Sequence, residues 1–358
     1  TWSDQPNPLV SAAAMPGGAI ASYAGDYPKS FNYYLDNNTF SANLFSSMYE
    51  TLLGMDPLTA DYEPGLAEKW AVSDDKRTFT FWLDPRARWS DGRPVTVEDV
   101  IWTFQTIMDP QNLTGVHKGG LEKINPPVAL GTQAVCFTAR EVHWRNLGAV
   151  GGFHVLPKHV WAKADFNKIN FEFPVVSGPY RLGEVKEGVL ARLERRADWW
   201  GRACRRFQGS GNFQTITYRF YAERENAFEV FKKGGVDLYP VYTARLWANE
   251  TSGERFEKNW IIKQTVHNSQ PIGFQGFAMN LRRSPFDDVR VRKAMACLLD
   301  REKMNRTLMY NQYFLHRSYF EDLYDREHPC PNPLWTFDPE RAQALLREAG
   351  WAVNPETG

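Results

Sequence analysis

The sequence predicts an α/β protein, because strand and helix patterns mix along the whole chain. Residues 277–281 alternate in the manner of a strand, and residues 291–298 then place apolar side chains at helical spacing. Two alternating runs within residues 66–83 flank a polar turn and predict a hairpin. Residues 338–350 begin with Asp-Pro and end with Gly, which is the punctuation of a helix.

The first long helix is predicted over residues 38–54. Its apolar residues recur every three or four positions, as on the buried face of a helix. Asn38 or Thr39 can cap its start, and Gly54 stands where a helix ends.

A second helix is predicted to begin at Thr96, which together with Asp99 approximates a capping box. The Asp-Pro pair at 109–110 is expected to stop it. In the helix predicted over 291–298, the expected buried stripe is Val291, Ala294, Met295 and Leu298, with Cys297 beside it as a free thiol. The remaining expected elements are strands at 19–24, 133–140, 213–222 and 236–239, two strands within 177–200, and short helices at 157–163 and 223–234.

Composition places the chain among globular proteins of two or three domains. It has 358 residues, with 42 basic and 42 acidic side chains, 43% hydrophobic residues and 14% aromatic residues. This charge balance gives no basis for binding nucleic acid. No run of about 18 apolar residues predicts a membrane span, and no signal peptide is recognised after Thr1. The 13 tryptophans can line pockets or fill the core, and the second is favoured.

No catalytic or metal-binding motif is recognised. The seven histidines lack HExxH spacing, so no metal site is expected. GxSxG, GxGxxG and P-loop motifs are absent, and paired carboxylates stand at turns, where capping explains them. The basic stretch 192–206 is a solvated strand edge or an anion site, the first being favoured. Cys204 and Cys330 are able to pair in an oxidising compartment, a question left open. These absences favour a binding protein, with an unrecognised hydrolase as the alternative.

Several motifs resemble one protein family. Residues 276–304, GFAMNLRRSPFDDVRVRKAMACLLDREKM, resemble a signature of the family 5 extracellular solute-binding proteins, the peptide-binding components of ABC importers. Residues 274–320 look most like the YejA-type oligopeptide-binding branch of that family. Further similar segments follow in the order of the family, namely 50–70, 89–104, 177–188, 197–201 and 338–351.

The resemblance implies a type II periplasmic-binding-protein fold, with a ligand enclosed between two lobes. Family members continue beyond the helix that ends at Gly350, so the resemblance implies that lobe II is incomplete here. The residue that pairs with a peptide's ammonium group in relatives would lie in the missing part. The implied division is lobe I at 1–45 and 172–270, an inserted subdomain at 46–171, a hinge crossover at 271–280 and lobe II at 281–358.

The implied ligand is an oligopeptide, bound through backbone hydrogen bonds in the manner of an added strand. Alternatives with the same fold are an oligosaccharide, a nickel chelate or haem. The implied partners are the ABC permease subunits of the inner membrane, the location is periplasmic or extracytoplasmic, and a monomer without cofactor is expected. The expected ligand residues are Asn37, Asn38, Thr39, Phe40, Gly178, Pro179, Tyr180, Tyr239, Tyr242 and Trp247, and the expected hinge residues are Gly273, Gly276, Phe277 and Asn280.

Overall fold

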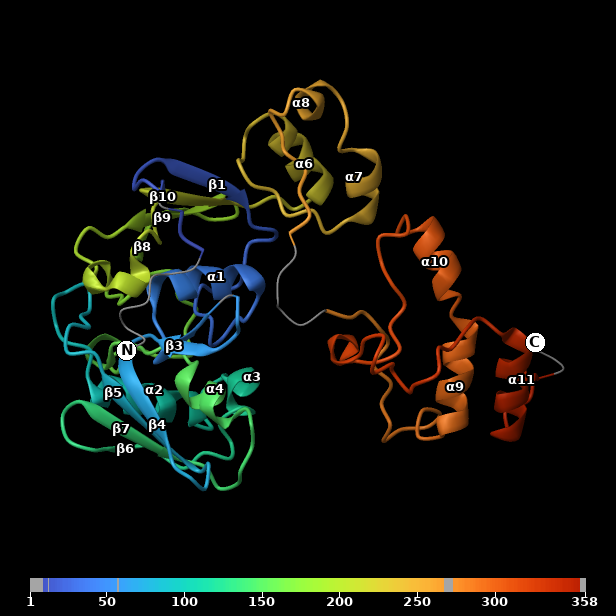
Figure 1. Ribbon diagram of the computed structural model, residues 1–358, viewed down its shortest axis with the longest axis horizontal. Helices are drawn as coiled ribbons and strands as arrows, with labels where there is room; N and C mark the ends of the chain where they lie inside the picture. The colour runs from blue at the N-terminus through green and yellow to red at the C-terminus, as the bar shows by residue number, and fades with distance from the viewer. Residues whose placement is uncertain (1–8, 12, 57, 267–272, 355–358) are drawn as a thin grey trace. The chain divides into compact units, whose positions relative to one another are not determined.

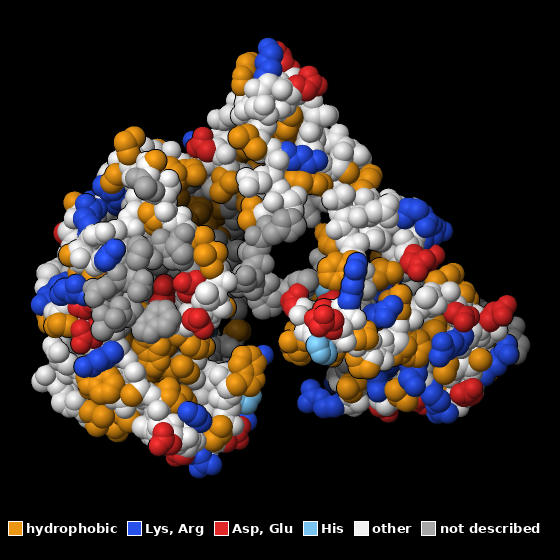
Figure 2. Space-filling view, viewed as in Figure 1, with side chains coloured by type: hydrophobic (Ala, Val, Ile, Leu, Met, Phe, Trp, Pro, Cys, Tyr) orange, Lys and Arg blue, Asp and Glu red, His pale blue; other side chains and the backbone are white. Residues whose placement is uncertain are grey.

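The computed structural model describes residues 9–11, 13–56, 58–266 and 273–354, and the chain divides into two compact units. The first unit runs to Pro240 and the second begins at Val241 (Figure 1). The first unit contains the sheets described below together with helices. The described part of the second unit consists of helices and irregular segments. Basic and acidic side chains are intermixed over the face shown in Figure 2, as the zero net charge leads one to expect.

The first sheet has the strand order β1-β10-β9-β8. β1 pairs with β10 in parallel, whereas the other two pairings are antiparallel. Helix α1 lies beside this sheet (Figure 1) and places five buried side chains, including Phe40 and Phe45, against the core. The elements are β1 (Ala19–Tyr23), α1 (Thr39–Met48), β8 (Tyr180–Lys186), β9 (Leu190–Arg195) and β10 (Thr215–Arg219).

The second sheet is antiparallel, with the order β4-β5-β7-β6. β5 alternates partly exposed and buried residues, as the hairpin prediction required. Helix α2 lies against it, and a separate two-stranded ribbon, β2-β3, completes the strands. The elements are β2 (Leu53–Met55), β3 (Tyr62–Pro64), β4 (Ala67–Val72), β5 (Thr78–Leu83), α2 (Val97–Met108), β6 (Val128–Ala129) and β7 (Ala134–Thr138).

One continuous aromatic-rich core joins the two sheets of the first unit. Phe31, Phe45, Tyr49, Phe81 and Phe137 are fully buried in it. The tryptophans of this core, which the composition analysis favoured, include Trp89, Trp161, Trp199 and Trp200. The other elements of this unit are α3 (Gly115–Lys118), α4 (Asn146–Gly151), α5 (Lys158–Trp161), η2 (Trp200–Ala203), η3 (Arg205–Phe207) and α6 (Arg224–Lys232).

The second unit has a small core in which α9 packs on α11. Val291, Ala294 and Cys297 are buried on α9, and Ala342 is buried on α11. Cys297 is therefore the buried residue of the last turn, whereas Leu298 is 42% exposed, which corrects the expected stripe. All four cysteines are free thiols. The elements are α7 (Ala244–Asn249), α8 (Glu254–Glu257), α9 (Val289–Leu298), α10 (Arg301–Thr307), η4 (Glu321–Leu323) and α11 (Pro339–Glu348).

The predicted helix over 38–54 is too long. It ends at Met48, whose carbonyl accepts the backbone N–H groups of Ser177 and Gly178. Tyr49 is extended, and Gly54 pairs with Glu63 in the β2-β3 ribbon. The apolar pattern of the sequence continues past Met48 because Tyr49, Leu52 and Leu53 are also buried. These residues are not part of the helix, and the pattern therefore predicted a helix that is too long.

Two predicted strands are also wrong. Residues 273–280 have no regular secondary structure, and Phe277 is 81% exposed. A strand needs a partner for its backbone groups, and within the described residues none pairs with this segment. Residues 236–239 make only an isolated parallel bridge, from Leu238 to Ser22.

The capping box of α2 is confirmed and gives a stability prediction. The Thr96 hydroxyl accepts from the backbone N–H of Asp99, whose carboxylate accepts from the backbone N–H of Thr96. Thr96→Ala leaves a helix-end N–H unpaired, so we expect the free energy of unfolding to fall by about 1 kcal/mol. Urea unfolding measures it. Thr96→Ser, which keeps the hydroxyl, should behave like the parent protein.

Candidate ligand-binding site

A tight turn before α1 brings two tyrosines and an exposed loop together. The backbone N–H groups of Leu35 and Asp36 both donate to the carbonyl of Asn32, and the Asn32 side chain accepts from the N–H of Tyr34. The loop that follows ends at Asn38, whose side chain caps α1 by accepting from the N–H of Ser41 at 2.8 Å. The capping role predicted for Asn38 is therefore confirmed.

The loop offers unpaired backbone groups. Asn37 is exposed, and within the described residues its N–H and carbonyl have no hydrogen-bond partner, nor has the N–H of Asn38. Thr39 is exposed at the first position of α1. Phe40, by contrast, is 5% exposed and packs edge-on against Phe31. The loop can therefore bind through its backbone and polar side chains, whereas the ring of Phe40 faces the core.

Two histidines stand behind this turn as neutral, hydrogen-bonded groups. His154 Nδ1 lies 2.8 Å from the carbonyl of Tyr49, which only accepts, so the proton is on Nδ1. Burial lowers the pKa of His154 to about 4. His117 Nε2 lies 3.1 Å from the carbonyl of Tyr33, and burial also lowers the pKa of His117.

These groups line two adjoining hollows of about 170 and 440 Å³. Tyr33, Tyr34 and His117 line the smaller one, and Ser46 and Glu63 help to line the larger. Both hollows share three residues, Gly148, Gly152 and His154. In the smaller hollow, hydroxyls, neutral imidazoles and rings suit an uncharged polar ligand with apolar parts.

Gly148 is required by the wall between the hollows. A Cβ atom there would lie 2.4 Å from the hydroxyl oxygen of Tyr62, closer than nonbonded atoms can approach. At Gly152, a Cβ atom would lie 2.6 Å from the carbonyl oxygen of Gly148. Gly148 therefore lets α4 approach Tyr62, and Gly152 lets the chain pass close to the carbonyl of Gly148.

Glu50 also lines the larger hollow. Its carboxylate accepts from Trp200 Nε1 at 2.8 Å, and its backbone N–H donates to the hydroxyl of Ser177 at 3.0 Å. Burial raises the pKa of Glu50 to about 7. Glu63, in the same hollow, also has a raised pKa because of burial.

The structure places the two predicted lobe I segments at opposite ends of α1. Gly178 contacts the C-terminal end, where a Cβ atom would lie 2.6 Å from the carbonyl of Ser47. Asn38 lies at the N-terminal end, ten residues before Met48, which is about 15 Å along a helix. Tyr180 is buried and donates to the carbonyl of Phe213. Pro179 lines a different recess, described below.

The other residues expected at the site are dispersed. Tyr239 is buried, stacks on Tyr23 at 4.9 Å and donates to the carbonyl of Arg224. In the second unit, Tyr242 is 72% exposed, and Trp247 carries the ammonium of Lys263 over its ring at 4.2 Å.

The expected hinge residues that the structure describes also lie in the second unit. Gly273, Gly276, Phe277 and Asn280 are exposed residues of an irregular segment. Residues 271 and 272 of the expected hinge lie outside the described residues. The lobe boundaries and the hinge stay predictions.

Sequence reasoning missed His117, His154, Tyr33 and Tyr34 as site residues. The two histidines are far from the tyrosine pair and from each other in the chain, and no spacing rule joins them. Among the described residues, no group of three or more His, Cys, Asp or Glu side chains could hold a metal ion. No helix in the described ranges is long and apolar enough to cross a membrane.

Comparison with known proteins identifies the family. Residues 61–358 match the model of the bacterial extracellular solute-binding proteins, family 5. The uncharacterized protein YejA of Escherichia coli is 32% identical over 321 residues, covering 87% of this chain and 51% of YejA. The peptidoglycan-binding protein YepA of Agrobacterium fabrum is 32% identical over 332 residues, covering 86% and 51%. The chain thus spans about half the length of these relatives.

Solved structures show the same fold. AppA of Bacillus subtilis, in complex with a nonapeptide, superimposes with a TM-score of 0.75 at 19% identity, covering 96% of this chain and 66% of AppA. NikZ of Campylobacter jejuni, in complex with Ni(L-His), gives a TM-score of 0.70 at 19% identity, covering 95% and 64%. Because the family match spans most of the sequence, this chain belongs to the family 5 bacterial extracellular solute-binding proteins, which have an α/β type II fold and are binding proteins, not enzymes.

Proposed function

We propose that this chain is the ligand-binding component of an ABC importer and that its ligand is an oligopeptide. The observation that carries the proposal is the loop at Asn37 and Asn38, where both backbone N–H groups and the Asn37 carbonyl have no hydrogen-bond partner among the described residues, and which follows Tyr33 and Tyr34 of the smaller hollow. An extended peptide can add to such a segment as a strand does to a sheet edge, through backbone hydrogen bonds.

The smaller hollow, which Tyr33 and Tyr34 line just before the loop, suits peptide side chains of varied kinds. Tyr33 and Tyr34 supply rings, and the two histidines are neutral, because burial lowers the pKa of each. The lining of the smaller hollow has no Asp, Glu, Lys or Arg, so it does not select one side chain by its sign, which fits sequence-tolerant binding. AppA was solved with a nonapeptide, which supports the same ligand class.

The test separates backbone from side-chain recognition at Asn37. Asn37→Pro removes the N–H and fixes φ, whereas Asn37→Ala keeps the backbone. We expect Asn37→Pro to weaken binding of a pool of short synthetic peptides by about tenfold or more, because a lost hydrogen bond costs about 1.5 kcal/mol. Asn37→Ala should bind like the parent protein. Calorimetric titration measures both, and equal affinities for the two variants would contradict the proposal.

Other ligands are outcomes of the same titration. YepA is named as a peptidoglycan-binding protein and NikZ was solved with Ni(L-His), so a peptidoglycan digest and the nickel–histidine chelate are offered in parallel. Tighter binding of either would replace the oligopeptide in the proposal. An oligosaccharide and haem are titrated in the same way as further alternative ligands.

The proposed partners follow from the family. Its members are extracellular solute-binding proteins, so we expect a periplasmic or extracytoplasmic location and delivery to the permease subunits of the inner membrane. We also propose that the protein works as a monomer. Light scattering at micromolar concentration would show a dimer if this is wrong.

A further inference from the structure

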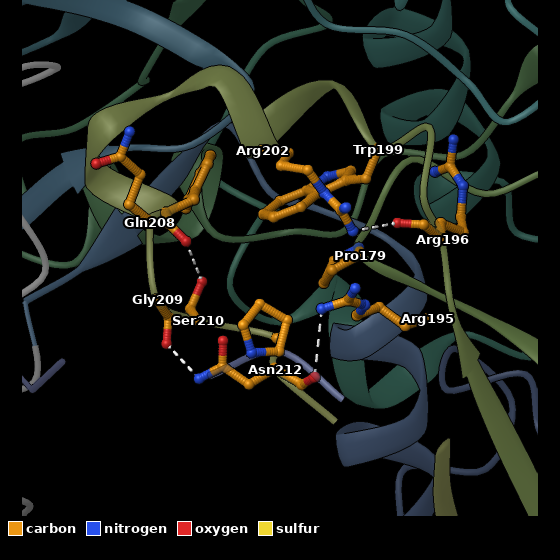
Figure 3. A pocket seen from close by; sticks show the side chains of 12 residues that line it. Pro179, Arg195, Arg196, Trp199, Arg202, Gln208, Gly209, Ser210 and Asn212 are labelled. Atoms are coloured by element: carbon orange, nitrogen blue, oxygen red, sulfur yellow. Dashed lines mark hydrogen bonds between the residues drawn. The ribbon is translucent and has the colours of Figure 1, made fainter. Parts of the chain in front are cut away.

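A further recess lies on the first unit, and of its lining residues Phe207 alone also lines the larger hollow of the proposed peptide site. It has a volume of about 160 Å³ and is bounded by the end of β9, the η2-η3 segment and the loop 208–212 (Figure 3). Trp199 and Phe207 supply rings to its lining, and Pro179 supplies a further apolar surface. The walls therefore suit a small ligand with a flat apolar part.

The loop that closes one side is held in shape by its own side chains. Ser210 donates its hydroxyl to the carbonyl of Phe207 at 2.6 Å, and Asn212 donates its side-chain amide to the carbonyl of Gly209 at 2.6 Å (Figure 3). Gly209 and Gly211 have φ of 76° and 60°, which favour glycine. A recess whose wall is already ordered binds without the cost of ordering it.

Two arginines reach into this recess. Arg202 donates to the carbonyl of Arg196 at 2.9 Å, and Arg195 donates to the carbonyl of Asn212 at 3.3 Å, which orients both guanidinium groups (Figure 3). Each guanidinium has five N–H donors, so most remain available. Within the described residues neither has an acidic partner, and no Asp or Glu lines the recess.

Two neighbouring arginines, Arg196 and Arg206, differ because they are buried and form hydrogen bonds within the protein. Arg196 is buried, donates to the carbonyls of Val176 and Gly178, and pairs with Asp198 at 3.2 Å. Arg206 is buried, donates to the carbonyl of Gly65 and lies 3.7 Å from the carboxylate of Asp84. Of the three arginines that line the recess, Arg195 and Arg202 are therefore the two without an acidic partner among the described residues.

We propose that this recess binds a small organic anion, namely a carboxylate joined to a flat apolar group. The carboxylate would accept from Arg195 and Arg202, because guanidinium groups match planar oxyanions. The apolar group would lie against Trp199 and Phe207. Its arginines are separate from the proposed peptide site, since Arg195 and Arg202 line neither hollow, and Asn37, His117 and His154 do not line the recess.

Benzoate is a suitable probe, and chemical-shift titration of the indole N–H signals is the measurement. We expect saturable, salt-sensitive binding of benzoate to the whole chain. Arg195→Gln and Arg202→Gln should each weaken it by about tenfold, the effect of losing a charged hydrogen bond of about 1.5 kcal/mol. Benzamide, which has the ring without the charge, should bind weakly or not at all.

Arg205→Gln is the matched control. Arg205 is an exposed arginine of the same basic stretch but does not line the recess, so its substitution should leave benzoate binding unchanged. Equal weakening in all three variants would show a diffuse surface charge effect and overturn the site. Binding of benzamide as tight as that of benzoate would overturn the role of the arginines. Inorganic phosphate tests the ring requirement, and phosphate binding as tight as that of benzoate would overturn the apolar half of the site.

Discussion

Glu50→Gln is expected to raise the free energy of unfolding at pH 8 by about 3 kcal/mol. Burial raises the pKa of Glu50 from 4.5 to about 7. Above pH 7 the unfolded chain has an ionised Glu50 at no cost, whereas the folded protein must hold the charge in a buried site. Glutamine removes that cost and can still accept from Trp200 Nε1.

The effect has a defined pH window. Below pH 4.5 the carboxyl is protonated in both states, so the substitution should be nearly neutral. Between pH 4.5 and 7 the folded protein holds a proton that the unfolded chain has released, so Glu50 lowers stability by about 1.4 kcal/mol per pH unit. The gain from glutamine should therefore grow with pH and level off above 7.

His154 has the opposite pH dependence. Burial lowers its pKa from 6.5 to about 4. Between these two pH values the imidazole is protonated in the unfolded chain and neutral in the folded protein. Its contribution to stability is full above pH 6.5 and is lost as the pH falls toward 4. Between pH 4.5 and 6.5 the stability lost with rising pH through Glu50 offsets the stability gained through His154. In the Glu50→Gln variant, the free energy of unfolding should therefore rise with pH over this range because of His154 alone.

Urea unfolding at a series of pH values measures how the free energy of unfolding changes with pH. Unfolding is monitored by hydrogen exchange of the amides in β4 and β5, which belong to the same unit as Glu50 and His154. Glu122→Gln, at an exposed position, is the control. The cause assigned to Glu50 is wrong if Glu50→Gln keeps the pH dependence of the parent protein, or if Glu122→Gln changes it equally.

Local patterns predicted those elements whose ends are fixed by their own residues. The cap at Asn38, the capping box at Thr96 and the Asp-Pro start of α11 are each confirmed, because the groups that pair there are a few residues apart. The hairpin of β4 and β5 is confirmed for the same reason.

Elements that depend on distant partners were predicted less well. The end of α1 is set by the N–H groups of Ser177 and Gly178, far along the chain, and no local signal at Met48 marks it. The segment 277–281 has the alternation of a strand, but alternation does not supply a pairing partner. The likeness to the family predicted the fold class correctly, since its motifs carry such long-range information.

The candidate site illustrates the same limit. Asn37 and Asn38 could be predicted, because they precede a helix that the sequence marks clearly. His117 and His154 could not, since they meet Tyr33 and Tyr34 only through contacts between separate segments. Burial then sets their protonation, and burial of a single histidine is not visible in the sequence.

The second large effect is expected from Phe45→Ala. Phe45 is fully buried on α1, and its ring packs edge-on against Tyr34 and His154, at 5.7 and 5.5 Å between ring centres. Removing the ring leaves a cavity, so the free energy of unfolding should fall by about 3–5 kcal/mol. Because the same ring supports the wall of the hollows, we also expect weaker binding of the peptide pool.

Phe104→Ala separates these two effects. Phe104 is 2% exposed on α2, packs on Phe137 and lines neither hollow, so its loss should also cost about 3–5 kcal/mol. Both variants are titrated with the peptide pool at a temperature where each remains folded by circular dichroism. Weaker binding by the Phe45 variant alone is the expected result. Equal affinities would mean that the hollows behind α1 do not contact the ligand, and that the peptide site must be sought elsewhere on this chain.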